Sequence, residues 1–395
     1  MAQHSRDNCP CPRCRRQDTL QREVDIFSVQ LTFTQLDKLP DSSVVVRATG
    51  LEVKCTLPLH YDDVHWDTHH IGLYPWEWLL KYSSRSFYKA QGLGLETIVG
   101  PVLWTADQIK ENPPSVQYDE VMASDAGVGR WTQKIREFGF CFVDGVPVCP
   151  HKTQELLERI SFVRPTHYGG FYDFTSDLTM KDTAYTSEAI GPHTDTTYFT
   201  DPAGLQMFHL LSHEDGVGGE SLLVDGFKAA QELDIRDREN LYTYNISWHA
   251  SGNDGITIHP SRNFPVLTQT GPANLPLQIR WNNADRRTVN PRIFEKWAGS
   301  AKAFSDIVND PKMQYWEQLQ PGRALSEWSK AAGFLFMETS NADALIVFDN
   351  WRILHGRSAF TGKRRICGGY INHDDFWSRF LNTNYTRDEV IQHIL

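Results

Sequence analysis

The apolar positions of this chain fall into short runs that are separated by glycine and proline residues. A Gly218-Gly219 pair, for example, lies between two of the runs. Short apolar runs with turn residues between them are typical of strands in a double-sheet β-sandwich of the jelly-roll or cupin kind. The clearest runs span residues 205–211, 221–224, 344–348 and 366–371. We therefore expect a double-stranded β-helix as the core of the chain.

Other segments carry apolar residues at helical spacing. The spacing over residues 131–138 predicts a helix that leads into a buried strand at 139–143. The spacing over approximately residues 151–162 predicts a second helix. The apolar stripe of the second helix consists of Leu156, Leu157, Ile160 and Phe162. The tail up to Leu395 is expected to be a short helix. The predicted fold class is therefore mainly β with flanking helices.

These patterns suggest three parts along the chain. Residues 1–85 are expected to form a small β-rich module, and residues 126–395 the main domain. The proline-containing segment 86–125 between them reads as a linker with little regular structure.

Composition narrows the possible partners. A chain of 395 residues with 40% apolar content can bury a large core. The net charge of −10 and the lack of a long basic run argue against nucleic acid as a partner. No apolar stretch reaches the length that spans a bilayer, so we expect no membrane insertion. The 12 Trp, 14 Tyr and 21 Phe supply aromatic walls that could bind a small cation.

Five His-x-Asp strings occur in the chain, and context favours the one formed by His193 and Asp195. In an extended segment residues i and i+2 project to the same side. His355, which follows the run 344–348, could join this pair to complete the facial triad of non-haem Fe(II) oxygenases, which leaves three positions for cosubstrate and dioxygen. Arg364 could then clamp the far carboxylate of 2-oxoglutarate. The alternative is that the three ligands, His193, Asp195 and His355, are ordinary polar loop residues.

The cysteines indicate a second metal site. Cys9, Cys11 and Cys14 form a Cys-x-Cys-x-x-Cys cluster, and the total of seven cysteines argues against a disulfide framework. Three thiolates around one point lack only a fourth ligand for tetrahedral zinc. The alternative is a free N-terminal tail with reduced thiols.

Three long motifs resemble the trimethyllysine dioxygenases and their sister family, the γ-butyrobetaine dioxygenases, which are the 2-oxoglutarate oxygenases of carnitine biosynthesis. The motifs span residues 193–199, 218–227 and 348–357, and the resemblance extends from Arg6 to Asp375. It implies Fe(II) at His193, Asp195 and His355, 2-oxoglutarate at Arg364 and Ser221, and ascorbate as the reductant. It also implies a structural Zn²⁺ on the cysteine cluster, with His70, or His69 as second choice, as the fourth ligand.

The same resemblance implies a substrate site. Asp182 would pair with the α-ammonium of trimethyllysine, whereas the butyrobetaine enzymes have an Asn at this position. Asn282 and Asn283 are candidates to bind the substrate carboxylate, in an order that the residues leave open. Tyrosines would form the trimethylammonium cage, with Tyr172 in place of the usual Trp; they are Tyr168, Tyr172, Tyr185 and Tyr370.

The implied reaction is the hydroxylation of trimethyllysine at C3, coupled to decarboxylation of 2-oxoglutarate to succinate. Two alternatives stay open: hydroxylation of γ-butyrobetaine, which Asp182 disfavours, and a non-catalytic cupin-like protein that binds methylated amines. The family also suggests a homodimer. Residues 1–15 do not resemble a transit peptide, so a cytoplasmic protein is expected, with a mitochondrial one as the alternative. The segment 326–342 is an insertion relative to the family, either a surface loop or a gene-model artefact.

Overall fold

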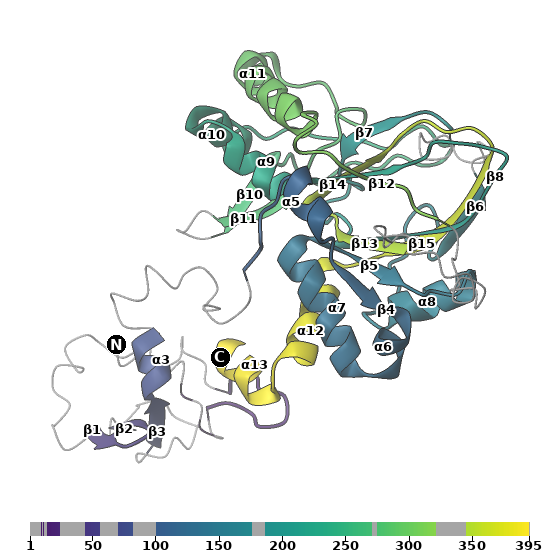
Figure 1. The fold of residues 1–395 in the computed structure, drawn as a ribbon. Coiled ribbons are helices and arrows are strands. Elements are labelled where there is room, and N and C mark those ends of the chain that lie inside the picture. The colour runs from purple at the N-terminus through teal and green to yellow at the C-terminus, as the bar shows by residue number, and fades with distance from the viewer. Residues whose placement is uncertain are drawn as a thin grey trace. The chain divides into compact units, whose positions relative to one another are not determined.

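The computed structural model describes residues 9, 11, 14–23, 44–55, 70–81, 100–175, 186–270, 275–320 and 345–394. Contacts within the chain divide it into two compact units, each drawn in Figure 1. The larger unit is Thr97–Arg387, and the smaller unit is Met1–Glu96 with Asp388–Leu395. The predicted insertion 326–342 and the site candidates Asp182 and Tyr185 lie outside the described residues.

The larger unit contains a six-stranded and a four-stranded sheet, whose neighbouring strands run antiparallel except for β4 and β5. The order of the first sheet is β4 (Ser115–Gln117), β5 (Phe140–Asp144), β13 (Leu345–Asp349), β8 (Leu205–Glu214), β15 (Lys363–Ile371) and β6 (Tyr172–Thr175). The order of the second is β12 (Tyr315–Glu317), β9 (Ser221–Asp225), β14 (Ile353–Arg357) and β7 (Ile190–His193). All four runs predicted as strands are strands, and the mainly β class is confirmed.

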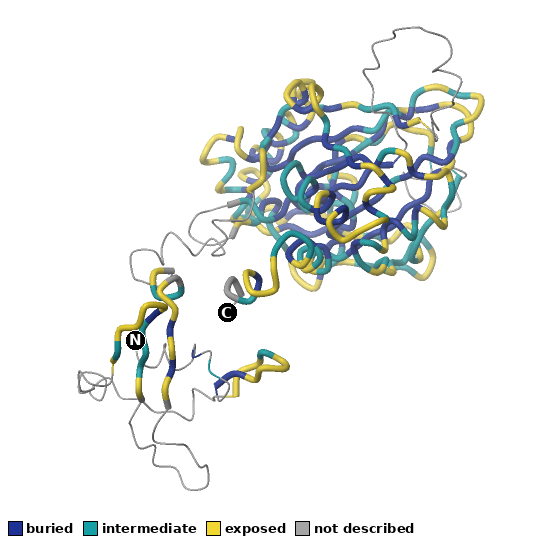
Figure 2. The backbone as a smooth tube through the Cα atoms, turned by 60° about the horizontal axis from the view of Figure 1, so that its bottom comes forward, coloured by how far each residue is buried: buried dark blue, intermediate teal, exposed yellow. Residues whose placement is uncertain are grey.

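One hydrophobic cluster joins the two sheets. Buried side chains of the six-stranded sheet, such as Phe142 and Ile346, lie in the same cluster as Leu223 and Ile353 of the four-stranded sheet. The two sheets therefore bury their inner faces against each other, as sandwich packing requires. Figure 2 shows that the buried residues concentrate in the interior of the larger unit.

The helix predicted at residues 131–138 is the second half of α7 (Asp125–Phe138), which packs on β5. The Ser124 side chain caps its N-terminus by accepting a hydrogen bond from Gly127 N at 3.1 Å. Gly139 ends it in the left-handed conformation, with φ +83°. The chain then enters β5 directly, as the pattern predicted.

A second hydrophobic cluster lies around three further helices and a hairpin, and it includes Trp248, Trp281 and Phe304. The helices are α9 (Gly226–Glu232), α10 (Ile235–Thr243) and α11 (Pro291–Val308). The hairpin strands are β10 (Leu267–Thr270) and β11 (Leu275–Ile279). At the C-terminal end of the chain are α12 (His373–Asn384) and the expected tail helix, α13 (Arg387–Ile394).

Two expectations about regular structure were wrong in part. The second predicted helix, α8 (Pro150–Glu158), ends earlier than expected because its last turn tightens, with Ile160 N donating to Leu157 O. Phe162 therefore leaves the apolar stripe and is 65% exposed.

The segment expected as an irregular linker also contains regular structure. Besides β4 it includes α5 (Ala106–Glu111) and α6 (Tyr118–Ala123), and these elements belong to the larger unit. Its prolines lie between elements instead of excluding them, and Pro114 O accepts a hydrogen bond from Phe142 N of β5.

The described part of the smaller unit contains a three-stranded antiparallel sheet, so the expected β-rich character is observed there. Cys9 and Cys14 are buried against Tyr74. The strands are β1 (Val44–Arg47), β2 (Gly50–Cys55) and β3 (His70–Pro75), followed by α3 (Trp76–Lys81). Within the described residues of the whole chain, no helix combines the length and apolarity that crossing a bilayer needs.

Candidate active site

The two predicted histidine ligands lie on neighbouring strands of the four-stranded sheet. His193 is the last residue of β7, and the antiparallel register places it directly opposite His355 of β14. Directly opposite residues project to the same side of a sheet, and the two ring centroids are 4.4 Å apart. Both imidazoles therefore face one region, to which Asp195 adds a carboxylate just after β7.

The three side chains converge on a single point. Asp195 Oδ1 lies 3.1 Å from His193 Nε2 and 3.6 Å from His355 Nε2. One ligand atom from each residue falls within 4.8 Å of the others. Two imidazoles and one carboxylate in this arrangement are the donor set of a non-haem Fe(II) site, so these residues fit that metal.

Hydrogen bonds hold two of the ligands in place. His193 Nδ1 lies 2.9 Å from Gly191 O, and since a carbonyl can only accept, Nδ1 carries the hydrogen and Nε2 is left for a metal. The Asn350 side chain brackets the main chain of Asp195: its Oδ1 accepts from Asp195 N at 2.7 Å, and its Nδ2 donates to Asp195 O at 3.1 Å.

The charges in the site suit metal binding. Burial would raise the pKa of Asp195, but the adjacent His355 and His193 hold that pKa well below its ordinary value, so the carboxylate is ionised. Burial and the neighbouring His193 lower the pKa of His355, which favours the neutral imidazole that a metal requires. For His193, burial opposes protonation, yet the hydrogen bond that its imidazole donates to Asp195 raises its pKa. A bound metal would displace that proton.

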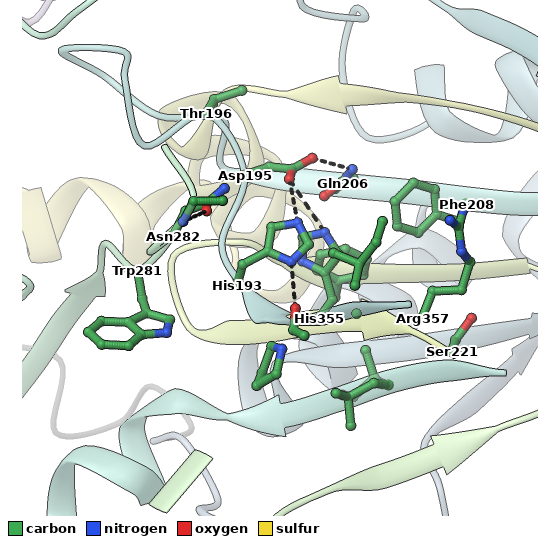
Figure 3. Close-up of a pocket in the computed structure, with 18 of the residues that line it drawn as sticks. His193, Asp195, Thr196, Gln206, Phe208, Ser221, Trp281, Asn282, His355 and Arg357 are labelled. Atoms are coloured by element: carbon green, nitrogen blue, oxygen red, sulfur yellow. Dashed lines mark hydrogen bonds and ion pairs between the residues drawn. The ribbon is translucent and has the colours of Figure 1, made fainter. Parts of the chain in front are cut away.

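A cavity of about 380 Å³ lies over the triad. Figure 3 shows His193, Asp195 and His355 clustered within it, with Ser221 and Arg357 on one side and Trp281 and Asn282 on the other. The cavity wall includes every predicted site residue of the main domain that the structure describes. Besides the triad, these are Tyr168, Tyr172, Ser221, Asn282, Asn283, Arg364 and Tyr370.

The tyrosines of the cavity wall are fixed by their hydroxyl groups. Tyr172 donates to Met207 O at 2.8 Å, and the Tyr168 and Tyr198 hydroxyls lie 3.3 Å apart. The Tyr172 and Tyr370 rings meet edge to face, with centroids 5.9 Å apart. An aromatic wall of this kind attracts a cation that cannot donate hydrogen bonds.

Arg364 is a buried cation that fits an anionic ligand. It is 3% exposed, its Nε has no hydrogen-bond partner, and it forms no ion pair with any described residue. Burial and the nearby Arg357 lower its pKa to about 9. Ser221 lies opposite Arg357 in the register of β9 and β14. A carboxylate bound in the cavity would pair with the Arg364 guanidinium, and 2-oxoglutarate carries such a carboxylate.

The two asparagine candidates differ in their surroundings. Asn282 holds a turn: its Oδ1 accepts from Ala284 N, and its Nδ2 donates to Asp285 Oδ2 at 2.8 Å. Asn283 is more exposed, and its Oδ1 accepts from Arg286 Nε at 3.1 Å. Of the two amide NH₂ groups, that of Asn283 is therefore the more available for a hydrogen bond to a substrate.

Comparison with known proteins agrees with this geometry. The family model described as Taurine catabolism dioxygenase TauD, TfdA family matches residues 104–326. Trimethyllysine dioxygenase of Neurospora crassa is 41% identical over 98% of this chain and 81% of its own length. The chain belongs to the trimethyllysine dioxygenase family. A mitochondrial member from Rattus norvegicus is 32% identical over 94% of this chain and 79% of its own. Gamma-butyrobetaine dioxygenase of Pseudomonas sp. (strain AK-1) is more distant, at 27% identity over 95% of this chain and 88% of its own.

Sequence reasoning missed several residues that line the site of this trimethyllysine dioxygenase family member. Gln206, Tyr198 and Phe208 all line the cavity. Gln206 lies in the run that was predicted as the strand 205–211, and a polar side chain inside a buried apolar run was the available signal. Arg357 also lines the cavity; it is the last residue of the motif 348–357, and its Nη2 donates to Thr186 O and Glu188 O.

The cysteine cluster of the smaller unit forms as predicted. Cys9, Cys11 and Cys14 offer sulfur atoms within 4.8 Å of one another. A Cβ atom placed on Gly72 would lie 2.9 Å from Cys9 Sγ, so the cluster lies against β3. His70 is the first residue of that strand, two positions before Gly72, and its side chain, like His69, lies outside what the structure describes.

Proposed function

We propose that this protein hydroxylates N6,N6,N6-trimethyllysine at C3, using Fe(II), 2-oxoglutarate and dioxygen, as the first step of carnitine biosynthesis. The observation that carries the proposal is the placement of a complete facial triad, an unpaired buried arginine and a tyrosine wall in one cavity. The paired sheets around it would be the double-stranded β-helix of the oxygenase core.

When bound, Fe(II) with 2-oxoglutarate reduces dioxygen, so that one oxygen atom enters the substrate C–H bond while the cosubstrate becomes succinate and CO₂. His193, Asp195 and His355 would hold the metal on one face. Arg364 and the Ser221 hydroxyl, which both line the cavity, would hold the distal carboxylate of 2-oxoglutarate.

The remaining walls would orient the substrate. Tyr168, Tyr172 and Tyr370, with Tyr185, would surround the trimethylammonium group. Asp182 would pair with the α-ammonium, and Asn283, with Asn282 as the alternative, would donate to the α-carboxylate. With both ends held, a single carbon faces the metal, and this positioning is the protein's main contribution to the reaction.

We further propose a structural zinc site in which His70 completes the Cys9, Cys11 and Cys14 cluster, since four protein ligands leave no open position. Ascorbate would act as the reductant that keeps the iron in its ferrous state, and the protein would form a homodimer. The rat relative is described as mitochondrial, which supports a mitochondrial location over the cytoplasmic one. Imaging of the tagged protein would decide between these compartments.

Mass spectrometry tests the reaction directly. Purified protein is incubated with Fe(II), 2-oxoglutarate, ascorbate and either trimethyllysine or γ-butyrobetaine. We expect an added oxygen atom on trimethyllysine and stoichiometric succinate. Oxygen addition to γ-butyrobetaine alone would move the chain to the sister activity, and metal binding without turnover of either compound would indicate a non-catalytic binding protein.

A further inference from the structure

The two carboxylate oxygens of Asp195 have different surroundings. Oδ1 faces the imidazoles of His193 and His355. Oδ2 faces away from that point and accepts two hydrogen bonds, from Gln206 Nε2 at 2.7 Å and from the Tyr370 hydroxyl at 2.7 Å. Figure 3 shows the Gln206 amide meeting Asp195 on the side away from the histidines.

The two donors are placed by strand register. Gln206 of β8 lies directly opposite Tyr370 of β15, so their side chains project to the same side of the sheet. They are 2% and 5% exposed. Gln206 Nε2 also lies 3.4 Å from the Tyr370 hydroxyl, so the two donors form one group around Oδ2.

The orientation of the Gln206 amide follows from its partner. A carboxylate oxygen only accepts hydrogen bonds, so the amide must present its NH₂ to Asp195. Its Oε1 is then buried without a partner among the described residues. A buried acceptor is seldom left without a hydrogen-bond partner. Here the unpaired Oε1 is the consequence of an amide orientation that keeps the NH₂ group on Asp195 Oδ2.

We propose that Gln206 and Tyr370 are positioning residues that restrict Asp195 to metal binding through Oδ1 alone. The inference rests on the proposed Fe(II) site. A carboxylate that bound through both oxygens would take one of the three positions that cosubstrate and dioxygen need. Because Tyr370 also belongs to the proposed cage, its hydroxyl ties the cage wall to a metal ligand.

Metal binding without substrate tests this inference. Tyr370→Phe removes one hydroxyl and keeps the aromatic face, and Gln206→Met removes the amide at similar size. The matched control is Gln278→Met, since Gln278 is a buried glutamine of β11 that does not line the cavity. Co(II) serves as the probe, with affinity measured by calorimetry and coordination by visible absorption.

We expect Gln206→Met and Tyr370→Phe each to weaken Co(II) binding by about ten- to a hundredfold, the usual effect of losing a hydrogen-bond partner of a metal ligand. Their Co(II) spectra should shift toward a higher coordination number, whereas Gln278→Met should match the unmodified protein. With Fe(II) present, the two variants should also form more succinate per hydroxylated product.

Unchanged Co(II) affinity and spectra in both folded variants would overturn the inference. If Gln206→Met does not fold, Tyr370→Phe decides the matter, because it removes a single oxygen atom. Failure of the proposed function is distinguishable: the unmodified protein would then bind no Co(II) at the triad, or would bind it and, with Fe(II) in place of Co(II), hydroxylate neither amine.

Discussion

Arg352 and Asp225 form an ion pair that solvent does not reach. Arg352 Nη2 lies 2.7 Å from Asp225 Oδ2, and the two side chains are 1% and 0% exposed. Arg352 also donates to Glu137 O at 2.9 Å and to Val102 O at 2.6 Å. The pair therefore anchors β14 three residues before the proposed ligand His355, and it joins this strand to the segments around α7.

Removing one partner of this pair should destabilise the fold. Asp225→Asn leaves the buried guanidinium of Arg352 without its counter-charge, which costs about 3–5 kcal/mol of unfolding free energy. Urea denaturation of the purified variant measures this. The control is Lys302→Met, which breaks an exposed ion pair with Asp306 and should change stability by less than about 1 kcal/mol.

Alanine at His193, Asp195 or His355 should abolish turnover, because each residue is proposed to supply one of three bonds to the metal. Circular dichroism should show a retained fold, and elemental analysis should show little iron. Near-normal turnover by any one of the three variants would remove that residue from the ligand set.

Arg364→Met should raise the KM for 2-oxoglutarate by about ten- to a hundredfold, because a charge-assisted contact of roughly 1.5–3 kcal/mol is lost. The neighbouring Arg365 is the matched control: it is exposed and paired with Asp173, so Arg365→Met should leave this KM nearly unchanged. Equal effects of the two substitutions would argue against a cosubstrate role for Arg364. Steady-state kinetics with varied 2-oxoglutarate makes the comparison.

Asp182→Asn should weaken trimethyllysine selectively and spare γ-butyrobetaine, which has no α-ammonium group. The lost contact is worth roughly 1.5–3 kcal/mol, or about ten- to a hundredfold in affinity. Competition experiments with both amines give the ratio. An equal loss for the two amines would place Asp182 away from the ammonium site.

Zinc should purify with the protein at one ion per chain. Cys11→Ser should lower the thermal stability of the protein more than it lowers kcat, because a closed four-ligand site supports folding and takes no part in the chemistry. Elemental analysis of freshly prepared protein provides the direct measurement, and freshly prepared protein that contains no zinc would refute the site.

The sequence predicted which three side chains converge better than it predicted their surroundings. His193, Asp195 and His355 could be chosen because their spacing and the strand-like runs beside them carry a recognisable pattern. Gln206 could not be chosen in the same way. It meets Asp195 together with Tyr370, which lies opposite it in the register of β8 and β15, and local patterns do not specify a pairing between positions 164 residues apart.

The prediction of helices and strands showed the same division between local and long-range causes. The strands and α7 follow from apolar periodicity, a serine cap and a terminal glycine. The segment before α7 was misread because its prolines suggested irregular structure, whereas β4 forms by pairing with β5, which follows it in the chain. Phe162 was misplaced because the pattern alone does not show where the last turn of a helix tightens.

The bracket that Asn350 makes around the Asp195 main chain has a consequence for metal selectivity in the cell. Hydrogen bonds hold the Asp195 main chain before any metal ion arrives, so the protein need not refold to bind an ion. The three proposed ligand side chains alone do little to exclude other divalent metal ions. Divalent ions bind such nitrogen and oxygen sites with affinities that rise from iron through cobalt and nickel. Iron loading therefore depends on the supply of each metal, and stray nickel or cobalt would act as an inhibitor that competes for the same three ligands.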